Sequence, residues 1–253
     1  MTPLEAHHLI LGAGTPWLYK LAVIVAALIG GALVRHDSRD WPLSTAGRAK
    51  VLAVVCLGSL IGCAIPAFFA GGTIGAMTTA TPLAPKTILG GLLFGFLAVA
   101  IYKRLTRNSA DTSDAFARGA IAMMLIGRLG CMAQHCCYGD VTSLAWGMDF
   151  GDGQARVPVQ YVEAAGLLAL ALGVQWMHSR DLMRGRRLFL LFAGYGLMRF
   201  GLEFLRARVA ESHWGVGFYQ WIALTLMAVG IFQLWKRSGN ASSPSGVPVE
   251  VRA

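Results

Sequence analysis

Seven long apolar blocks constrain the fold of this chain more than any other feature. The chain is 55% apolar, and only 14% of its residues are Asp, Glu, Lys or Arg, against about 25% in average globular domains. A helix needs about 17–25 residues to cross the bilayer core, and most blocks are that long. The sequence therefore predicts an all-α, polytopic membrane protein with seven transmembrane helices. The blocks cover residues 17–34, 51–70, 88–102, 119–132, 159–177, 188–204 and 216–235.

The third and fourth blocks are shorter than the others, so their helices are expected to be tilted or broken at glycines. Removing either block would break the alternation of basic and non-basic connections, so seven is the self-consistent number. The first block is too long for a signal peptide and has no small-residue cleavage site after it. We therefore expect it to remain as a membrane span.

The basic residues gather in every second connection. Most of the 22 Lys and Arg lie in residues 35–50, 103–118, 180–187 and 236–252. The positive-inside rule places these segments in the cytoplasm, which puts the N-terminus outside and the C-terminus in the cytoplasm. The net charge of +9 needs no nucleic-acid partner, because short juxtamembrane loops rich in Lys and Arg suit anionic lipid head groups.

The chain is expected to form a single transmembrane domain over residues 1–237. The longest outer connection, near residues 138–158, is rich in turn-forming residues, which predicts a surface cap rather than a further helix. Residues 238–253 are rich in Ser, Gly and Pro, which predicts a disordered cytoplasmic tail.

Arg128 lies next to an apolar run that reaches from residue 119 to residue 126. A cation at the centre of a membrane helix costs about 2.5–3.5 kcal/mol on insertion scales, so such an arginine needs a negative partner. That partner is either a carboxylate elsewhere in the bundle or a phosphate on a ligand. The second interpretation makes this region a lipid-handling site.

Other unusual polar residues fall at the same outer depth. Arg199 and Glu203 are four residues apart and share one helix face, as do Tyr195 and Arg199. One interpretation is a set of buried ion pairs that fixes helix packing. However, three arginines face two carboxylates in this layer, and a positive excess suits a phosphate. The remaining members of the layer are Arg128, Arg156, Gln160, Tyr161, Glu163, Arg206 and Gln220.

Three motifs, taken in order, resemble the bacterial prolipoprotein diacylglyceryl transferase family. They are Gly-Arg-Leu-Gly followed by Tyr-Gly within residues 127–139, Val-Pro-Val-Gln-Tyr-Val-Glu at 157–163, and Tyr-Gly-Leu-Met-Arg-Phe-Gly-Leu-Glu-Phe-Leu-Arg at 195–206. The resemblance spans the third to the seventh block. It implies seven spans in the bacterial inner membrane with the N-terminus outside. It also implies an enzyme that moves diacylglycerol from phosphatidylglycerol, or a related anionic phospholipid, to the lipobox cysteine of a preprolipoprotein.

Most candidate site residues match family positions, while His135 and Tyr195 come from their place in this sequence. The implied enzyme needs no cofactor and no metal. The candidate catalytic residues are Arg128, Arg199, Glu203 and His135. The candidate substrate-binding residues are Gly90, Gly91, Gly139, Gln160, Tyr161, Glu163, Tyr195 and Arg206.

This chain departs from the family pattern at several polar positions. Leu89 and Val157 replace histidines. The family signature reads Gly-Asn-x-x-Asn-Gly-Glu, and this chain has Cys131 and Gln134 at the two asparagines, His135 at the second glycine and Cys136 at the glutamate. The acceptor therefore does not follow from the resemblance. The alternatives are a diverged paralogue with another acceptor, or a non-catalytic lipid-binding or redox-linked membrane protein.

Transfer to a thiol requires neutralisation of the phosphate leaving group and a thiolate nucleophile. Arg128 and Arg199 suit the first task because the guanidinium fork matches phosphate oxygens. His135 is the candidate base near the signature, although a lone histidine is more often a packed residue. The field of the two arginines is the alternative means of activating the thiol.

The cysteine cluster allows several interpretations. Packing or a Cys131–Cys136 disulfide comes first, then a redox or catalytic thiol, and then a metal site, because Cys-x3-His-Cys does not match the usual zinc spacing. Cys56 and Cys63 lie inside the second apolar block and are expected to be packing residues.

Overall fold

The computed structural model describes residues 15–69, 87–151, 153–206 and 217–239. Seven α-helices lie in these residues, so the all-α prediction is confirmed. Two short 3-10 helices, η1 (Ser38–Asp40) and η2 (Glu203–Leu205), follow the first and sixth of them. The α-helices are α2 (Pro16–Asp37), α3 (Thr45–Phe69), α5 (Ile88–Leu105), α6 (Ser113–Ala133), α7 (Val159–Ser179), α8 (Arg187–Leu202) and α9 (Phe218–Gly239).

Each helix overlaps one of the seven apolar blocks. Six helices are long and apolar enough to cross a membrane, and α7 is not among these six within the described residues. The first turns of α7 contain Gln160, Tyr161 and Glu163, whose polar side chains lower its hydropathy. The structure thus supports a multi-pass membrane protein with six candidate spans and a seventh helix packed against α6 and α8.

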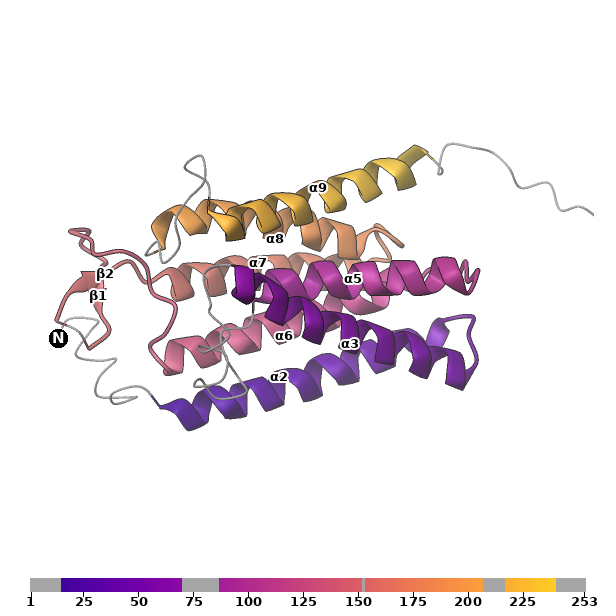
Figure 1. Cartoon of the computed structure of the whole chain (residues 1–253), viewed down its shortest axis with the longest axis horizontal. Helices are drawn as coiled ribbons and strands as arrows, with labels where there is room; N and C mark the ends of the chain where they lie inside the picture. Colours follow the sequence, from indigo (N-terminus) through magenta and orange to yellow (C-terminus); the bar gives the residue numbers. More distant parts are fainter. Residues whose placement is uncertain (1–14, 70–86, 152, 207–216, 240–253) are drawn as a thin grey trace, which may run out of the picture.

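Consecutive helices run in opposite directions along the long axis of the molecule (Figure 1). One end, called here the hairpin end, holds residues 134–151, 153–158 and 203–206. The opposite end, called the basic end, holds residues 38–44, 106–112 and 180–186 together with the end of α9. The basic connections predicted to share one side therefore do lie at one end of the bundle.

The helices pack mainly in three neighbouring pairs, α2 with α6, α3 with α5 and α8 with α9. Small residues allow the closest approaches, as is common between membrane helices. A Cβ atom on Gly119 of α6 would lie 2.7 Å from the carbonyl oxygen of Gly30 on α2. The two backbones can approach this closely only because both positions are glycine.

The main core lies between α6, α7, α8 and α9. Its largest fully buried side chains include Leu167, Phe189, Phe192 and Tyr195. The ring of Phe96 on α5 packs edge-on against both phenylalanines, with ring centroids 5.7 and 5.8 Å apart. This core supports the α7–α8 region from which several site residues extend.

Two short strands, β1 (Met148–Asp149) and β2 (Ala155–Arg156), pair antiparallel in the connection between α6 and α7. No helix lies in the described residues of that connection.

At the C-terminal end of the described residues, Ser238 and Gly239 complete α9. The rest of the predicted tail, residues 240–253, lies outside the described residues.

Candidate functional site

Glu163 on α7 is the centre of the predicted polar layer. Its side chain has no exposed surface. Oε1 accepts hydrogen bonds from Nη2 of Arg128 on α6 over 2.5 Å and from the hydroxyl of Tyr195 on α8 over 3.1 Å. Three helices therefore meet at one buried carboxylate, as the predicted common depth of these residues implies.

Arg199 joins Glu163 to a second carboxylate. Its Nη1 donates to Oε2 of Glu163 over 3.5 Å, and its Nη2 donates to Oε2 of Glu203 over 2.9 Å. The predicted pairing of Arg199 and Glu203 on one face is confirmed by this contact. A buried ion pair is tolerable only when its remaining donors and acceptors also find partners, which raises the question of what satisfies the rest of the layer.

Several buried polar atoms of this layer have no partner among the described residues. They are both amide atoms of Gln160, Nε of Arg128, and Nε and Nη2 of Arg206. Gln160 is completely buried. A buried donor without a partner costs about 1–3 kcal/mol, and most such groups in native proteins are satisfied. A ligand that accepts hydrogen bonds would satisfy the guanidinium atoms here.

Gly139 lies where three chain segments cross at the hairpin end. Its N–H donates to the carbonyl oxygen of Val157 over 2.8 Å, and the next residue, Asp140, donates to Leu205 over 3.1 Å. A Cβ at position 139 would lie 2.1 Å from the Leu205 carbonyl oxygen. Packing accounts for the glycine, which also pairs with Arg206 in an isolated bridge; its substrate-binding role stays a prediction.

Gly90 and Gly91 lie in the first turn of α5 and contact α3. A Cβ on Gly91 would lie 2.7 Å from Sγ of Cys63, and a Cβ on Gly62 would lie 2.4 Å from the carbonyl oxygen of Gly90. Leu89, which replaces a family histidine, is buried in the main core. Helix packing accounts for Gly91 and Gly62, and the role of Gly90 and Gly91 in substrate binding stays a prediction.

His135 is a buried residue of the hairpin end. It adopts a left-handed backbone conformation with φ 55°, and its ring packs edge-on against Phe150 with centroids 6.1 Å apart. Tyr138 stacks on the same Phe150 at 5.2 Å, and Arg156 lies over Tyr138 at 5.1 Å. These contacts give His135 a packing role, and its role as a base stays a prediction.

Cys131, Cys136 and Cys137 form a compact group beside the arginine layer. Their three Sγ atoms lie within 4.8 Å of one another, and no disulfide joins any two cysteines in the part of the chain that the structure describes. The pKa of Cys137 is lowered by hydrogen bonds from the other two thiols and by the nearby guanidinium groups of Arg206 and Arg128. The sequence places these three residues close together along the chain, but it does not show that their thiols converge in space.

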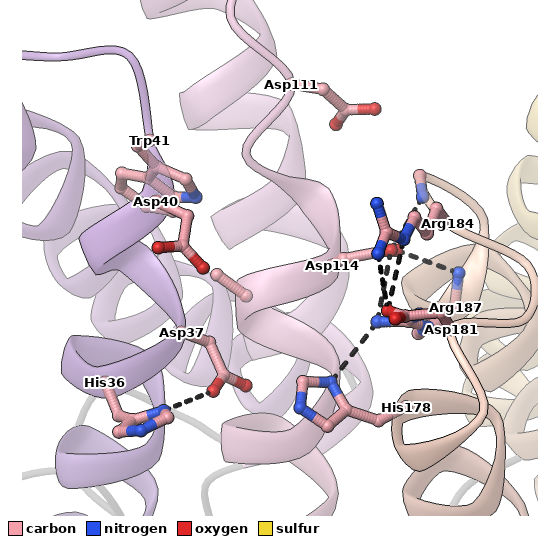
Figure 2. Close-up of a pocket in the computed structure, with 12 residues that line it drawn as sticks. His36, Asp37, Asp40, Trp41, Asp111, Asp114, His178, Asp181, Arg184 and Arg187 are labelled. Carbon is pink, nitrogen blue, oxygen red and sulfur yellow. Dashed lines mark hydrogen bonds and ion pairs between the residues drawn. The ribbon is translucent and has the colours of Figure 1, made fainter.

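A second polar region at the basic end was missed by sequence reasoning. It lines a cavity of about 660 Å³. In Figure 2, His36 and Asp37 from α2 lie on one side of this cavity. On the other side lie His178 and Arg187, with Nδ1 of His178 3.2 Å from Nη1 of Arg187. Short connections with many arginines were interpreted only as positive charge. The aspartates beside these arginines could have indicated a network of ion pairs.

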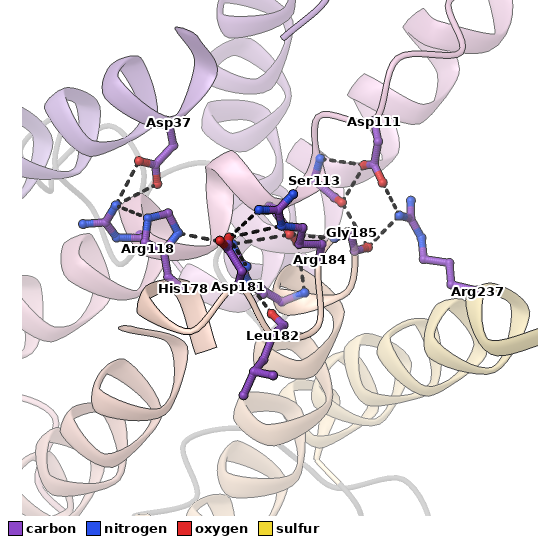
Figure 3. Close-up of polar contacts among 12 residues, drawn as sticks. Asp37, Asp111, Ser113, Arg118, His178, Asp181, Leu182, Arg184, Gly185 and Arg237 are labelled. Atoms are coloured by element: carbon purple, nitrogen blue, oxygen red, sulfur yellow. Dashed lines mark hydrogen bonds and ion pairs between the residues drawn. The ribbon is translucent and has the colours of Figure 1, made fainter. Parts of the chain in front are cut away.

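Asp37 and Asp114 at the basic end already have partners. Nη1 of Arg118 donates to Asp37 over 2.9 Å and lies 3.1 Å from Nε2 of His178 (Figure 3). Asp114 accepts from the backbone N–H groups of Gly185 and Arg187 over 2.6 and 3.0 Å. This network connects α2, α6, α7 and the start of α8, so we assign it to holding the basic end together.

Comparison with known proteins gives a result consistent with this geometry. The family model described as prolipoprotein diacylglyceryl transferase matches residues 15–236. The chain belongs to this family. That match spans all seven described α-helices, including both the arginine layer and the network at the basic end.

Individual members of the transferase family are distant relatives. The chain is 26% identical to phosphatidylglycerol–prolipoprotein diacylglyceryl transferase 2 of Clostridium perfringens over 57% of this chain and 59% of that protein. It is 29% identical to the corresponding transferase of a Wolbachia from Brugia malayi, covering 74% and 77% of the two chains. It is 27% identical to that of Roseobacter denitrificans, covering 85% and 87%. The first match spans less than two thirds of its relative.

Proposed function

We propose that this chain transfers diacylglycerol from phosphatidylglycerol, or a related anionic phospholipid, to the lipobox cysteine thiol of a preprolipoprotein. The observation that carries the proposal is the fully buried Glu163, which holds both Arg128 and Arg199 in one layer. Beside it, guanidinium atoms of Arg128 and Arg206 have no partner among the described residues. Family membership supports the same donor and acceptor.

The reaction places two demands on this layer. The acceptor sulfur attacks the diacylglycerol carbon that carries the phosphate ester; the S–C bond forms, the C–O bond breaks, and its electron pair leaves with glycerol phosphate. Arg128 and Arg199 would neutralise the charge on that leaving group. The acceptor thiol must also lose its proton, and the field of these arginines favours the thiolate.

Glu163 and Tyr195 would act as positioning residues. Glu163 accepts hydrogen bonds from both arginines, and the hydroxyl of Tyr195 on α8 also donates to Oε1. Glu203 would fix the other side of the Arg199 fork. Groups held in this way need little reorganisation as charge develops in the transition state.

The test is transfer by the purified full chain, with phosphatidylglycerol labelled in its diacylglycerol part and a lipobox peptide as acceptor. The wild-type chain should label the peptide. Arg128→Lys should reduce the rate by about 10²–10³-fold, because the planar fork is lost while the charge remains. Arg184→Lys is the matched control, since Arg184 is an exposed arginine at the basic end. A wild-type chain that binds the lipid but labels no peptide would contradict the proposal.

We further propose the arrangement of the chain in the bacterial inner membrane. The chain forms one domain that includes all of α9, with α7 as the seventh span; residues 138–158 form an outer cap, and the tail that follows Gly239 lies in the cytoplasm. The clustering of basic connections at the end opposite β1 and β2 supports this orientation. The hairpin end, with the arginine layer, would then face the outer leaflet.

Reporter fusions test the orientation directly. A phosphatase fused after Asp111 or Asp181 should be inactive because both positions would lie in the cytoplasm. The same reporter after Gly153, in the connection that holds β1 and β2, should be active. An active reporter at Asp111 would overturn the orientation.

A further inference from the structure

The three-thiol cluster takes no part in the transfer chemistry proposed above. The chain places Cys131, Cys136 and Cys137 within seven positions, and their Sγ atoms all lie within 4.8 Å of one another. We propose that the three thiolates form a binding site for a soft monovalent metal ion, Cu(I), at the hairpin end. This proposal does not rest on the transferase activity.

The backbone brings the three sulfurs together. α6 ends at Ala133, and the chain then turns back through left-handed residues, with φ 55° at His135 and 66° at Cys137. Non-glycine residues keep such conformations only when their surroundings determine them. The N–H of Cys136 donates to the carbonyl oxygen of Cys131 over 3.2 Å. Sγ of Cys136 lies 3.7 Å from the same oxygen, so Cys136 is held against the end of α6.

The spacing of the sulfurs fits a three-coordinate ion. With metal–sulfur bonds of about 2.3 Å, a planar three-thiolate site needs sulfurs about 4 Å apart. The observed separations of at most 4.8 Å require only small side-chain rotations to reach this value. A carboxylate or water ligand is not needed to complete such a site.

The number of ligands selects the ion. Thiolates favour Cu(I) and zinc, but structural zinc sites are almost always four-coordinate. Among the residues that the structure describes, the group contains three cysteines and no fourth His, Cys, Asp or Glu. Cu(I) is stable with three thiolates, whereas zinc would have to recruit an additional ligand.

Charge and access also suit a metal–thiolate group. Cu(I) with three thiolates carries two negative charges, and the guanidinium groups of Arg206 and Arg128 are close enough to interact with Cys137. Two buried guanidinium nitrogens of Arg206, Nε and Nη2, also have no hydrogen-bond partner among the described residues. Cys137 is exposed, so an ion can reach the group from the aqueous side.

The experiment uses the full chain carrying Cys56→Ser and Cys63→Ser, so that the cluster supplies the only remaining thiols. Cu(I) is added without oxygen in competition with bicinchoninate. We expect one Cu(I) per chain, with X-ray absorption showing three sulfur ligands at about 2.3 Å. Cys131→Ser, Cys136→Ser and Cys137→Ser should each weaken binding by about 100-fold or more, since even outer-shell changes cost 10–100-fold.

A second measurement needs no variant and therefore does not depend on how variants fold. In the wild-type chain, Cu(I) should protect Cys131, Cys136 and Cys137 from maleimide, and the same three thiols should react in the metal-free chain. Copper binding that survives removal of all three cysteines would overturn the proposal. So would a preference for zinc over Cu(I), or a disulfide within the cluster in cells quenched with acid.

Discussion

Arg128 and Glu163, on α6 and α7, meet through a 2.5 Å hydrogen bond although 35 positions separate them in the chain. Glu163 is completely buried and also accepts from Tyr195 and Arg199. One carboxylate therefore positions both arginines proposed to bind phosphate. Stability and transfer should depend on this pair in different ways, which makes the two roles separable.

Replacing both members of the pair tests this separation. Glu163→Met alone leaves two buried arginines facing each other, and breaking a buried pair costs about 3–5 kcal/mol. The double variant Arg128→Met with Glu163→Met should recover most of that loss, because apolar replacement of a buried pair is often neutral or stabilising. Thermal unfolding would show the recovery, while peptide labelling should stay about 10²-fold or more below wild type. Labelling that recovers together with stability would assign the pair to packing alone.

The sequence predicts the seven helices and much of the arginine layer for clear physical reasons. Apolar blocks of membrane length define the helices, and the four-residue spacing of Arg199 and Glu203 predicts their contact. A buried arginine beside an apolar block requires a partner, and Glu163 was one of the available carboxylates. These inferences depend on local spacing or on the cost of burying charge. Both can be judged from a single sequence.

Other features depend on contacts between distant segments. Gly139 is required because Leu205, far away in sequence, lies against it. The pairing of Asp114 with the backbone of Gly185 joins two connections whose docking no local pattern predicts. The convergence of Cys137 with Cys131 depends on left-handed backbone at non-glycine residues, which sequence propensity disfavours.

His135→Gln tests whether a histidine supplies the base. The packing of His135 against Phe150 explains why a histidine is present at this position. The field of Arg128 and Arg199 can favour an acceptor thiolate without a histidine base. We therefore expect the variant to keep transfer within about tenfold of wild type, since loss of a general base would cost about 10²–10⁴-fold. Rates measured across pH would show the same profile for both proteins. A large loss together with a missing pH limb would identify His135 as the base.

Gly139→Ala should destabilise the hairpin end. The new Cβ would lie 2.1 Å from the Leu205 carbonyl oxygen, so the backbone must move, at a cost of about 1–3 kcal/mol for overpacking. Gly127→Ala is the matched control, because a Cβ there meets no atom within 4 Å. Hydrogen exchange should rise at residues 139–141 and 155–157 in the first variant only. Equal exchange in both variants would contradict the packing role of Gly139.

Asp111 at the basic end should make stability depend on pH in the acid range. Burial raises the pKa of its carboxyl, but hydrogen bonds from Arg237 and Ser113 outweigh burial and leave the pKa below its ordinary 3.8. A carboxyl with a lowered folded-state pKa stabilises the fold above its unfolded pKa, and this stabilisation is lost as pH falls through the folded pKa. The Tm in detergent should therefore be insensitive to Asp111 protonation between about pH 7 and 5 and should fall below about pH 4. Asp111→Asn should have a lower Tm at neutral pH and a smaller acid-side fall. Asp140→Asn, at an exposed position of the hairpin end, is the control, and its Tm should follow that of the wild type. An unchanged acid-side fall of Tm in Asp111→Asn would show that Asp111 does not contribute.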